Sequence, residues 1–87
     1  MTAYAINKVC FLSERDAAFR EQLRTQPEAT LAAFPKLDAE ERQALLAGDV
    51  VALFRKGGHA FLLQHLAQHR LFGLNREIYR ERITTAR

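Results

Sequence analysis

The clearest local pattern in the chain is Asp-Ala-Glu-Glu-Arg-Gln-Ala-Leu-Leu-Ala-Gly-Asp at residues 38–49. Asp38 can accept a hydrogen bond from a free backbone N–H of a first helical turn, while Glu41 reaches back, as in a capping box. The leucine pair that follows supplies an inward face, and Gly48 offers a left-handed stop. The pattern therefore predicts a short amphipathic helix that is closed at both ends.

Short helices are also predicted on both sides of this one. Before it, Ser13 is interpreted as an N-cap, and Pro27 opens a helix that stops before Pro35. After it, helices are expected at residues 50–56, from 59 to about 71, and in a final charged segment capped by Asn75. No stretch alternates apolar and polar residues as a strand does. The sequence predicts an all-α fold, a small compact bundle of four to six short helices, as a single domain over residues 1–87.

The inward positions of these segments predict the core. The helix after Ser13 is expected to present Ala17, Ala18, Phe19 and Leu23 inward. The residues expected to be mostly buried across the chain are Phe19, Leu23, Leu31, Leu46, Leu53, Leu62 and Leu66.

Composition narrows the class of protein. A length of 87 residues is that of one domain, and its net charge of +3 lies largely in a tail of mixed sign, typical of a solvated helix face. We expect no nucleic-acid binding, because a DNA-binding surface gathers positive charge with few acids between. A single cysteine, no signal peptide and no long apolar run favour a cytoplasmic protein without membrane contact.

No residue pattern predicts catalysis or a cofactor in this chain. His65 and His69 have the i, i+4 spacing at which two imidazoles can share a metal ion. No acid lies between them, and no other Cys or His completes a ligand set with them or with His59, so no metal site is expected. Cys10 lies among apolar residues and is interpreted as a small core residue.

Five segments together resemble the alpha (small) subunit of protocatechuate 4,5-dioxygenase, the LigA-like family. They lie at residues 6–13, 15–19, 37–46, 48–49 and 53–58. The most specific part is Leu-Asp-Ala-Glu-Glu-Arg at 37–42 combined with Arg-Lys-Gly-Gly at 55–58. The resemblance covers residues 6 to about 71. The charged segment at 73–87 does not match, and His59 stands where the resemblance leads us to expect Asn.

The resemblance implies an all-helical chain that sits on a larger catalytic subunit and covers the mouth of its active site. Fe(II) and its ligands would belong to that larger subunit, which would open a catechol-type aromatic ring outside its two hydroxyls. The chain would then be a non-catalytic subunit of an extradiol-type dioxygenase. The alternative is a stand-alone helical interaction module, including one that self-associates, which keeps the fold without the dioxygenase role.

The contact surface for a partner is expected between residues 54 and 72. A helix from His59 to about Leu71 would turn Leu62, Leu63 and Leu66 to one side and aromatic residues to nearly the other. Phe61 and Phe72 are the expected anchors, with His59 or His65 nearest any substrate. The full set comprises Phe54, Arg55, Gly57, Gly58, His59, Phe61, His65 and Phe72. Alternatively, the terminal segments bury both faces of this helix.

Overall fold

A computed structural model describes residues 4–86, and the side chains of residues 4–85; over this range the chain is helical without any strand. The helices are α1 (Tyr4–Arg15), α2 (Ala17–Thr25), α3 (Pro27–Ala32), α4 (Ala39–Ala47), α5 (Val50–Arg55), α6 (Ala60–Gln68), the 3-10 turn η1 (Leu71–Gly73) and α7 (Arg76–Ala86). The predicted all-α bundle is confirmed. It has seven α-helices in the described range rather than four to six, because the segments on either side of Asp16 form separate helices.

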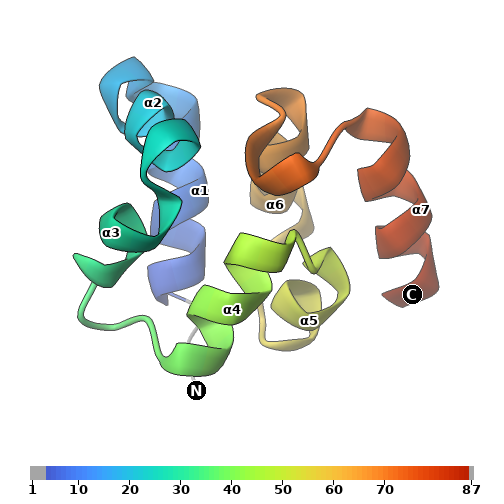
Figure 1. The fold of residues 1–87 in the computed structure, drawn as a ribbon. Helices are drawn as coiled ribbons and strands as arrows, with labels where there is room; N and C mark the ends of the chain where they lie inside the picture. The colour runs from blue at the N-terminus through green and yellow to red at the C-terminus, as the bar shows by residue number, and fades with distance from the viewer. Residues whose placement is uncertain (1–3, 87) are drawn as a thin grey trace.

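The helices form one compact body of 30 × 27 × 19 Å (Figure 1). α1 packs along α6, and α2 and α3 continue from α1 on one side. α4 and α5 lie in front of this pair, and α7 packs against α5 and α6 at the opposite edge. None of the described helices has the length and apolarity that a membrane crossing requires.

The predicted capping box of α4 is present in full. The backbone N–H of Glu41 donates to Asp38 Oδ1 at 2.7 Å, and the backbone N–H of Asp38 donates to Glu41 Oε1 at 2.9 Å. Gly48 ends the helix with a left-handed φ of 65°. A Cβ on Gly48 would lie 2.7 Å from the carbonyl oxygen of Phe72, so glycine also allows η1 to pack here. The caps predicted at Asp49 and Asn75 are confirmed as well.

The prediction that Ser13 is an N-cap is wrong. Ser13 lies inside α1, is fully buried, and donates its hydroxyl to the Val9 carbonyl at 2.7 Å. The cap is Asp16, whose carboxylate accepts from the backbone N–H groups of Ala18 and Phe19. A buried serine can satisfy its hydroxyl on the carbonyl four residues earlier, and aspartate caps equally well. This shift leaves Ala17 and Ala18 exposed instead of inward.

The helix expected to reach about Leu71 ends at Gln68. Arg70 and Phe72 both take left-handed backbone angles, with φ of 56° and 55°. Leu71 and Leu74, on either side of the turn at Phe72, are both buried, at 1% and 2% exposure. The chain thereby reverses toward α7.

The core prediction is correct for four residues and partly wrong for three. Leu23, Leu31, Leu53 and Leu66 are buried, whereas Phe19, Leu46 and Leu62 are half-buried and pack against the core. Leu45 and Leu63, the neighbours of two of these, are fully buried instead. Adjacent leucines differ by only about 100° around a helix, so a leucine pair leaves the choice of inward residue open.

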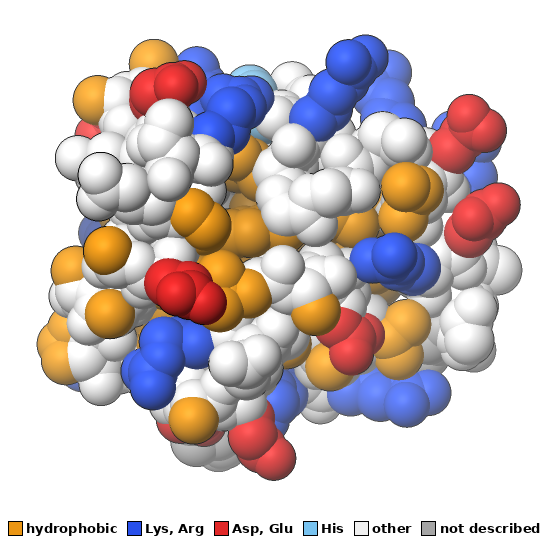
Figure 2. Space-filling view, viewed as in Figure 1, with side chains coloured by type: hydrophobic (Ala, Val, Ile, Leu, Met, Phe, Trp, Pro, Cys, Tyr) orange, Lys and Arg blue, Asp and Glu red, His pale blue; other side chains and the backbone are white. Residues whose placement is uncertain are grey.

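The surface of the bundle is mixed in character. On the face drawn in Figure 2, apolar side chains reach the surface between the helices, with Lys and Arg side chains around them. Of the large apolar side chains described, Tyr4, Phe11 and Phe61 are classed as exposed.

Candidate functional site

The Gly57-Gly58 turn sets the start of α6 and joins it to α1. Gly57 has a φ of 102°, and the N–H of Gly58 donates to the carbonyl of Leu53 at 2.9 Å. A Cβ on Gly58 would lie 2.8 Å from that carbonyl oxygen, so only glycine fits without a shift. Next, the backbone N–H of His59 donates to Asn7 Oδ1 of α1 at 3.0 Å. The turn that carries the sequence resemblance therefore also docks α6 on α1.

His59 is an N-cap residue in this structure. Its Nδ1 accepts a hydrogen bond from the backbone N–H of Phe61 at 3.2 Å, which takes the place of the usual Ser, Thr or Asp oxygen. His59 is exposed. His59 thus supplies a side-chain acceptor at the start of α6.

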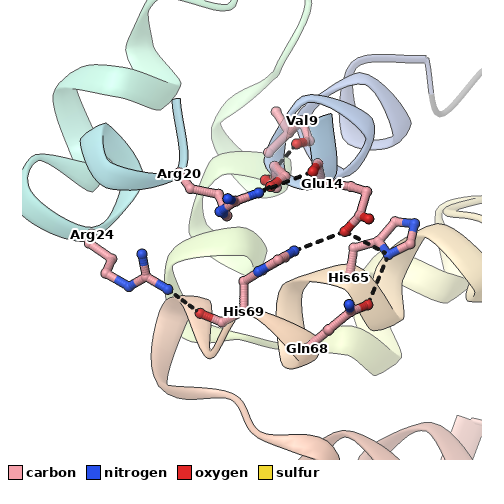
Figure 3. A network of polar contacts seen from close by, with 8 residues as sticks. Val9, Glu14, Arg20, Arg24, His65, Gln68 and His69 are labelled. Atoms are coloured by element: carbon pink, nitrogen blue, oxygen red, sulfur yellow. Dashed lines mark hydrogen bonds and ion pairs between the residues drawn. The ribbon is translucent and has the colours of Figure 1, made fainter. Parts of the chain in front are cut away.

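A cluster of one carboxylate and two imidazoles joins α1 to the end of α6 (Figure 3). Glu14 Oε1 lies 2.8 Å from His69 Nε2 and 3.6 Å from His65 Nδ1. His65 Nδ1 also lies 3.5 Å from Gln68 Oε1. Sequence reasoning missed Glu14, because its contacts with the histidines span 51 and 55 positions and only the packing of α1 along α6 brings them together.

Two arginines of α2 complete this network. Arg20 donates to the carbonyls of Ser13 and Glu14 at 2.8 and 3.0 Å, and Arg24 donates to the carbonyl of His69. They occupy carbonyl groups that the C-terminal turns of α1 and α6 leave without helical partners. The hydrogen bond from His69, followed by the charges of His65, His69 and Arg20, holds the pKa of Glu14 below its ordinary value of 4.5.

This lowered pKa predicts a stability difference that depends on pH. Ionised Glu14 stabilises the fold above its ordinary pKa, and the contribution is lost as the pH falls through the lower folded value. Glu14→Gln should therefore lower the thermal midpoint slightly at about pH 6, and the difference should shrink at about pH 3. Circular dichroism melts at both pH values measure this.

The matched control for that experiment is Glu81→Gln. Glu81 is an exposed residue of α7 whose carboxylate has no hydrogen bond or ion pair within the described residues. Its variant should melt close to the wild type at both pH values. A Glu14→Gln protein that behaves like Glu81→Gln throughout would contradict a stabilising role for the Glu14 cluster.

The chemistry that this cluster permits is limited by its own hydrogen bonds. Among the residues that the structure describes, no group of three or more His, Cys, Asp or Glu side chains could hold a metal ion. Cys10 is fully buried, and burial raises the pKa of its thiol to about 12, so it does not provide a thiolate nucleophile at neutral pH. The Glu14 cluster is therefore best described as a polar joint between helices.

The expected partner-surface residues differ widely in exposure. Phe61 is 61% exposed at the first turn of α6, and its ring meets His65 edge-on with ring centres 5.5 Å apart. Arg55, Gly57 and His59 are also exposed, whereas Phe54, His65 and Phe72 are half-buried and Gly58 is buried. The structure thus brings Phe61, His65 and His59 together at one end of α6.

Phe72 does not lie on the same helix as Phe61, although the sequence predicted that both would anchor the partner surface from one helix. It lies in η1, beyond the end of α6, with a left-handed backbone, and its side chain packs against the core. The expectation placed both anchors on one helix, which the break after Gln68 rules out.

Phe11 of α1 is a further exposed aromatic residue that sequence reasoning did not select. It is 44% exposed, and Arg15 lies over its ring at 5.4 Å. Asn7 and Glu14, which contact α6, lie within about 60° of Phe11 around α1. Phe11 therefore flanks the α1–α6 joint on its solvent side. Its exposure could not be read from the sequence, because the apolar residues of α1 surround the helix on more than one side.

Comparison with known proteins gives a family match. The family model described as the LigA subunit of the aromatic-ring-opening dioxygenase LigAB matches residues 6–80. The match extends the resemblance read from the sequence beyond residue 71, through η1 and into α7. No curated protein and no solved structure matches the chain.

Proposed function

This chain belongs to the LigA family of aromatic-ring-opening dioxygenase subunits, and we propose that it is the non-catalytic small subunit, or active-site cap, of an extradiol-type dioxygenase. The observation that carries the proposal is the family match over residues 6–80, which includes most of α1, all of α2 to η1, and the start of α7. In this role the chain acts through a larger subunit.

In the proposed complex, Fe(II) and its ligands lie on the larger subunit, where the metal would activate the substrate and oxygen for ring opening. The described residues of this chain offer hydrogen-bonded histidines and a buried thiol in place of a ligand set. Its own residues would contribute contact area and exclude water from the mouth of the active site.

The surface proposed to meet the larger subunit is the exposed end of α6. Phe61 presents a large apolar ring to solvent, and aromatic residues, phenylalanine included, are enriched at protein interfaces relative to the rest of the surface. The ring of His65 lies edge-on to this ring, and its Nδ1 lies 3.6 Å from Glu14 Oε1. Arg55 and His59 are exposed on the same segment, residues 54–72, and add polar groups to this surface.

Phe61→Ala tests this surface. The substitution should weaken binding to the larger subunit by more than about 1 kcal/mol, or roughly fivefold or more in Kd, because the ring would be buried in the complex. Calorimetric titration of the purified larger subunit with each chain gives the constants. The fold should be unaffected, since the ring is mostly in solvent.

Tyr4→Ala is the matched control, because Tyr4 is similarly exposed but lies beside Lys36, outside residues 54–72. It should bind as the wild type does. Equal binding by folded Phe61→Ala and wild-type chains would contradict the proposed surface. If Phe61→Ala alters only self-association and the larger subunit does not bind, the stand-alone interaction module is the better account.

A further inference from the structure

A cleft between α6 and α7 gathers polar side chains that the proposed partner surface does not use. It encloses about 430 Å³ and is lined by Gln64, Ala67, Gln68, Arg76, Tyr79, Arg80 and Ile83. The two arginines stand one helical turn apart on α7, and the two glutamines stand one turn apart on the facing helix α6. Ala67 and Ile83 are buried and supply an apolar floor.

The walls of the cleft are fixed to the rest of the molecule. The hydroxyl of Tyr79 donates to the Ala60 carbonyl at 2.8 Å, which ties α7 to the first turn of α6. Arg82 donates to the Gly48 carbonyl at 2.7 Å, and Asn75 caps the start of α7. The cleft is therefore formed before a ligand arrives, which lowers the entropy lost on binding.

Among the described residues that line the cleft, the charged side chains are the two arginines, so the charge that these residues give it is positive. Within the described residues, neither Arg76 nor Arg80 has an ion pair or a hydrogen bond from its guanidinium. Around α7, Glu77 lies about 100° from Arg76 and about 60° from Arg80, and Glu81 lies about 100° from Arg80. Of these, Glu77 borders the neighbouring hollow and does not line the cleft itself.

We propose that this cleft binds the carboxylate of a small organic anion with an apolar body. Arginine presents paired N–H donors that match the two oxygens of a carboxylate, and the glutamine amides of α6 supply further donors. The apolar body would lie against Ala67, Ile83 and the ring of Tyr79. The inference concerns the chain alone and does not depend on a larger subunit.

Titration of the full chain with benzoate, followed by NMR of backbone and arginine side-chain N–H signals, tests the site. We expect saturable shifts centred on residues 64–68 and 76–83, with a Kd in roughly the millimolar range. Arg80→Gln and Arg76→Gln should each weaken binding by about tenfold, because each removes a charged hydrogen-bond donor. Arg80→Lys, which keeps the charge but loses the paired donors, should also weaken it.

Arg55→Gln is the matched control, because Arg55 is exposed at the end of α5 and does not line the cleft. It should bind benzoate as the wild type does. Three results would overturn the proposal: no saturation with benzoate, equal weakening by Arg55→Gln, or undiminished binding by both folded cleft variants. Inorganic phosphate binding as tightly as benzoate would also overturn it, because the apolar floor would then contribute nothing.

Discussion

Replacing Leu66 with alanine should lower the free energy of unfolding by about 2–5 kcal/mol. The Leu66 side chain is fully buried in α6, where that helix packs between α1 and α7, so the substitution leaves a cavity as well as losing apolar contact. A domain of this size has a total stability near the lower end of the usual 5–15 kcal/mol. Urea denaturation followed by far-UV circular dichroism should therefore show a large loss, or a chain that is already partly unfolded.

Leu62→Ala is the control for this measurement, because it removes the same atoms from the same helix. Leu62 is only half-buried, so its replacement should lower the stability by distinctly less than that of Leu66. A loss below about 0.5 kcal/mol for Leu66→Ala would mean that α6 does not face the core as described. If Leu62→Ala lost more stability than Leu66→Ala, the side of α6 that faces the core would be misassigned.

Local sequence signals predicted the helix ends best where a capping residue and its hydrogen-bond partner lie within a few residues of each other. The Asp38 and Glu41 capping box, the Gly48 stop and the Asn75 cap all depend on groups within a few residues of each other. Ser13 failed because two competing caps lay three residues apart, and the choice of Asp16 depends on burying Ser13 against the core.

Features that depend on tertiary packing could not be predicted from the sequence. α6 ends at Gln68 because the backbone turns through left-handed angles at Arg70 and Phe72, and neither residue type signals such a turn in the sequence. The same break moved Phe72 off the helix, so only Phe61 of the two expected anchors stands out from the surface.

The sequence predicted only those residues of the candidate site that lie at the start of α6, and it missed those of α1. The Gly57-Gly58 turn, His59 and Phe61 were selected from sequence because they are contiguous and carry the family resemblance. Glu14 and Phe11 come from α1, and nothing near them in sequence indicates that α1 lies along α6. The cationic cleft was missed for the same reason, since the alternating charges of α7 resemble a solvated helix until its packing on α6 is known.

We expect ring opening to depend on both chains, the larger subunit and this small chain. The purified chain with Fe(II) and a catechol-type substrate should consume no oxygen, because no described group of side chains could hold the metal. The larger subunit with Fe(II) should become at least about tenfold more active when this chain is added, because covering the active site excludes water and completes it. The Phe61→Ala chain should need a higher concentration to reach the same activity.

Oxygen uptake in this reconstitution is the most direct measurement, made with the larger subunit alone, this chain alone, and both together. The account predicts uptake that is absent for this chain, weak for the larger subunit, and strong for the pair, with a ring-opened product in proportion to oxygen consumed. Uptake by this chain alone would contradict the non-catalytic role, and a larger subunit whose activity is unchanged by the chain would contradict the role as its cap.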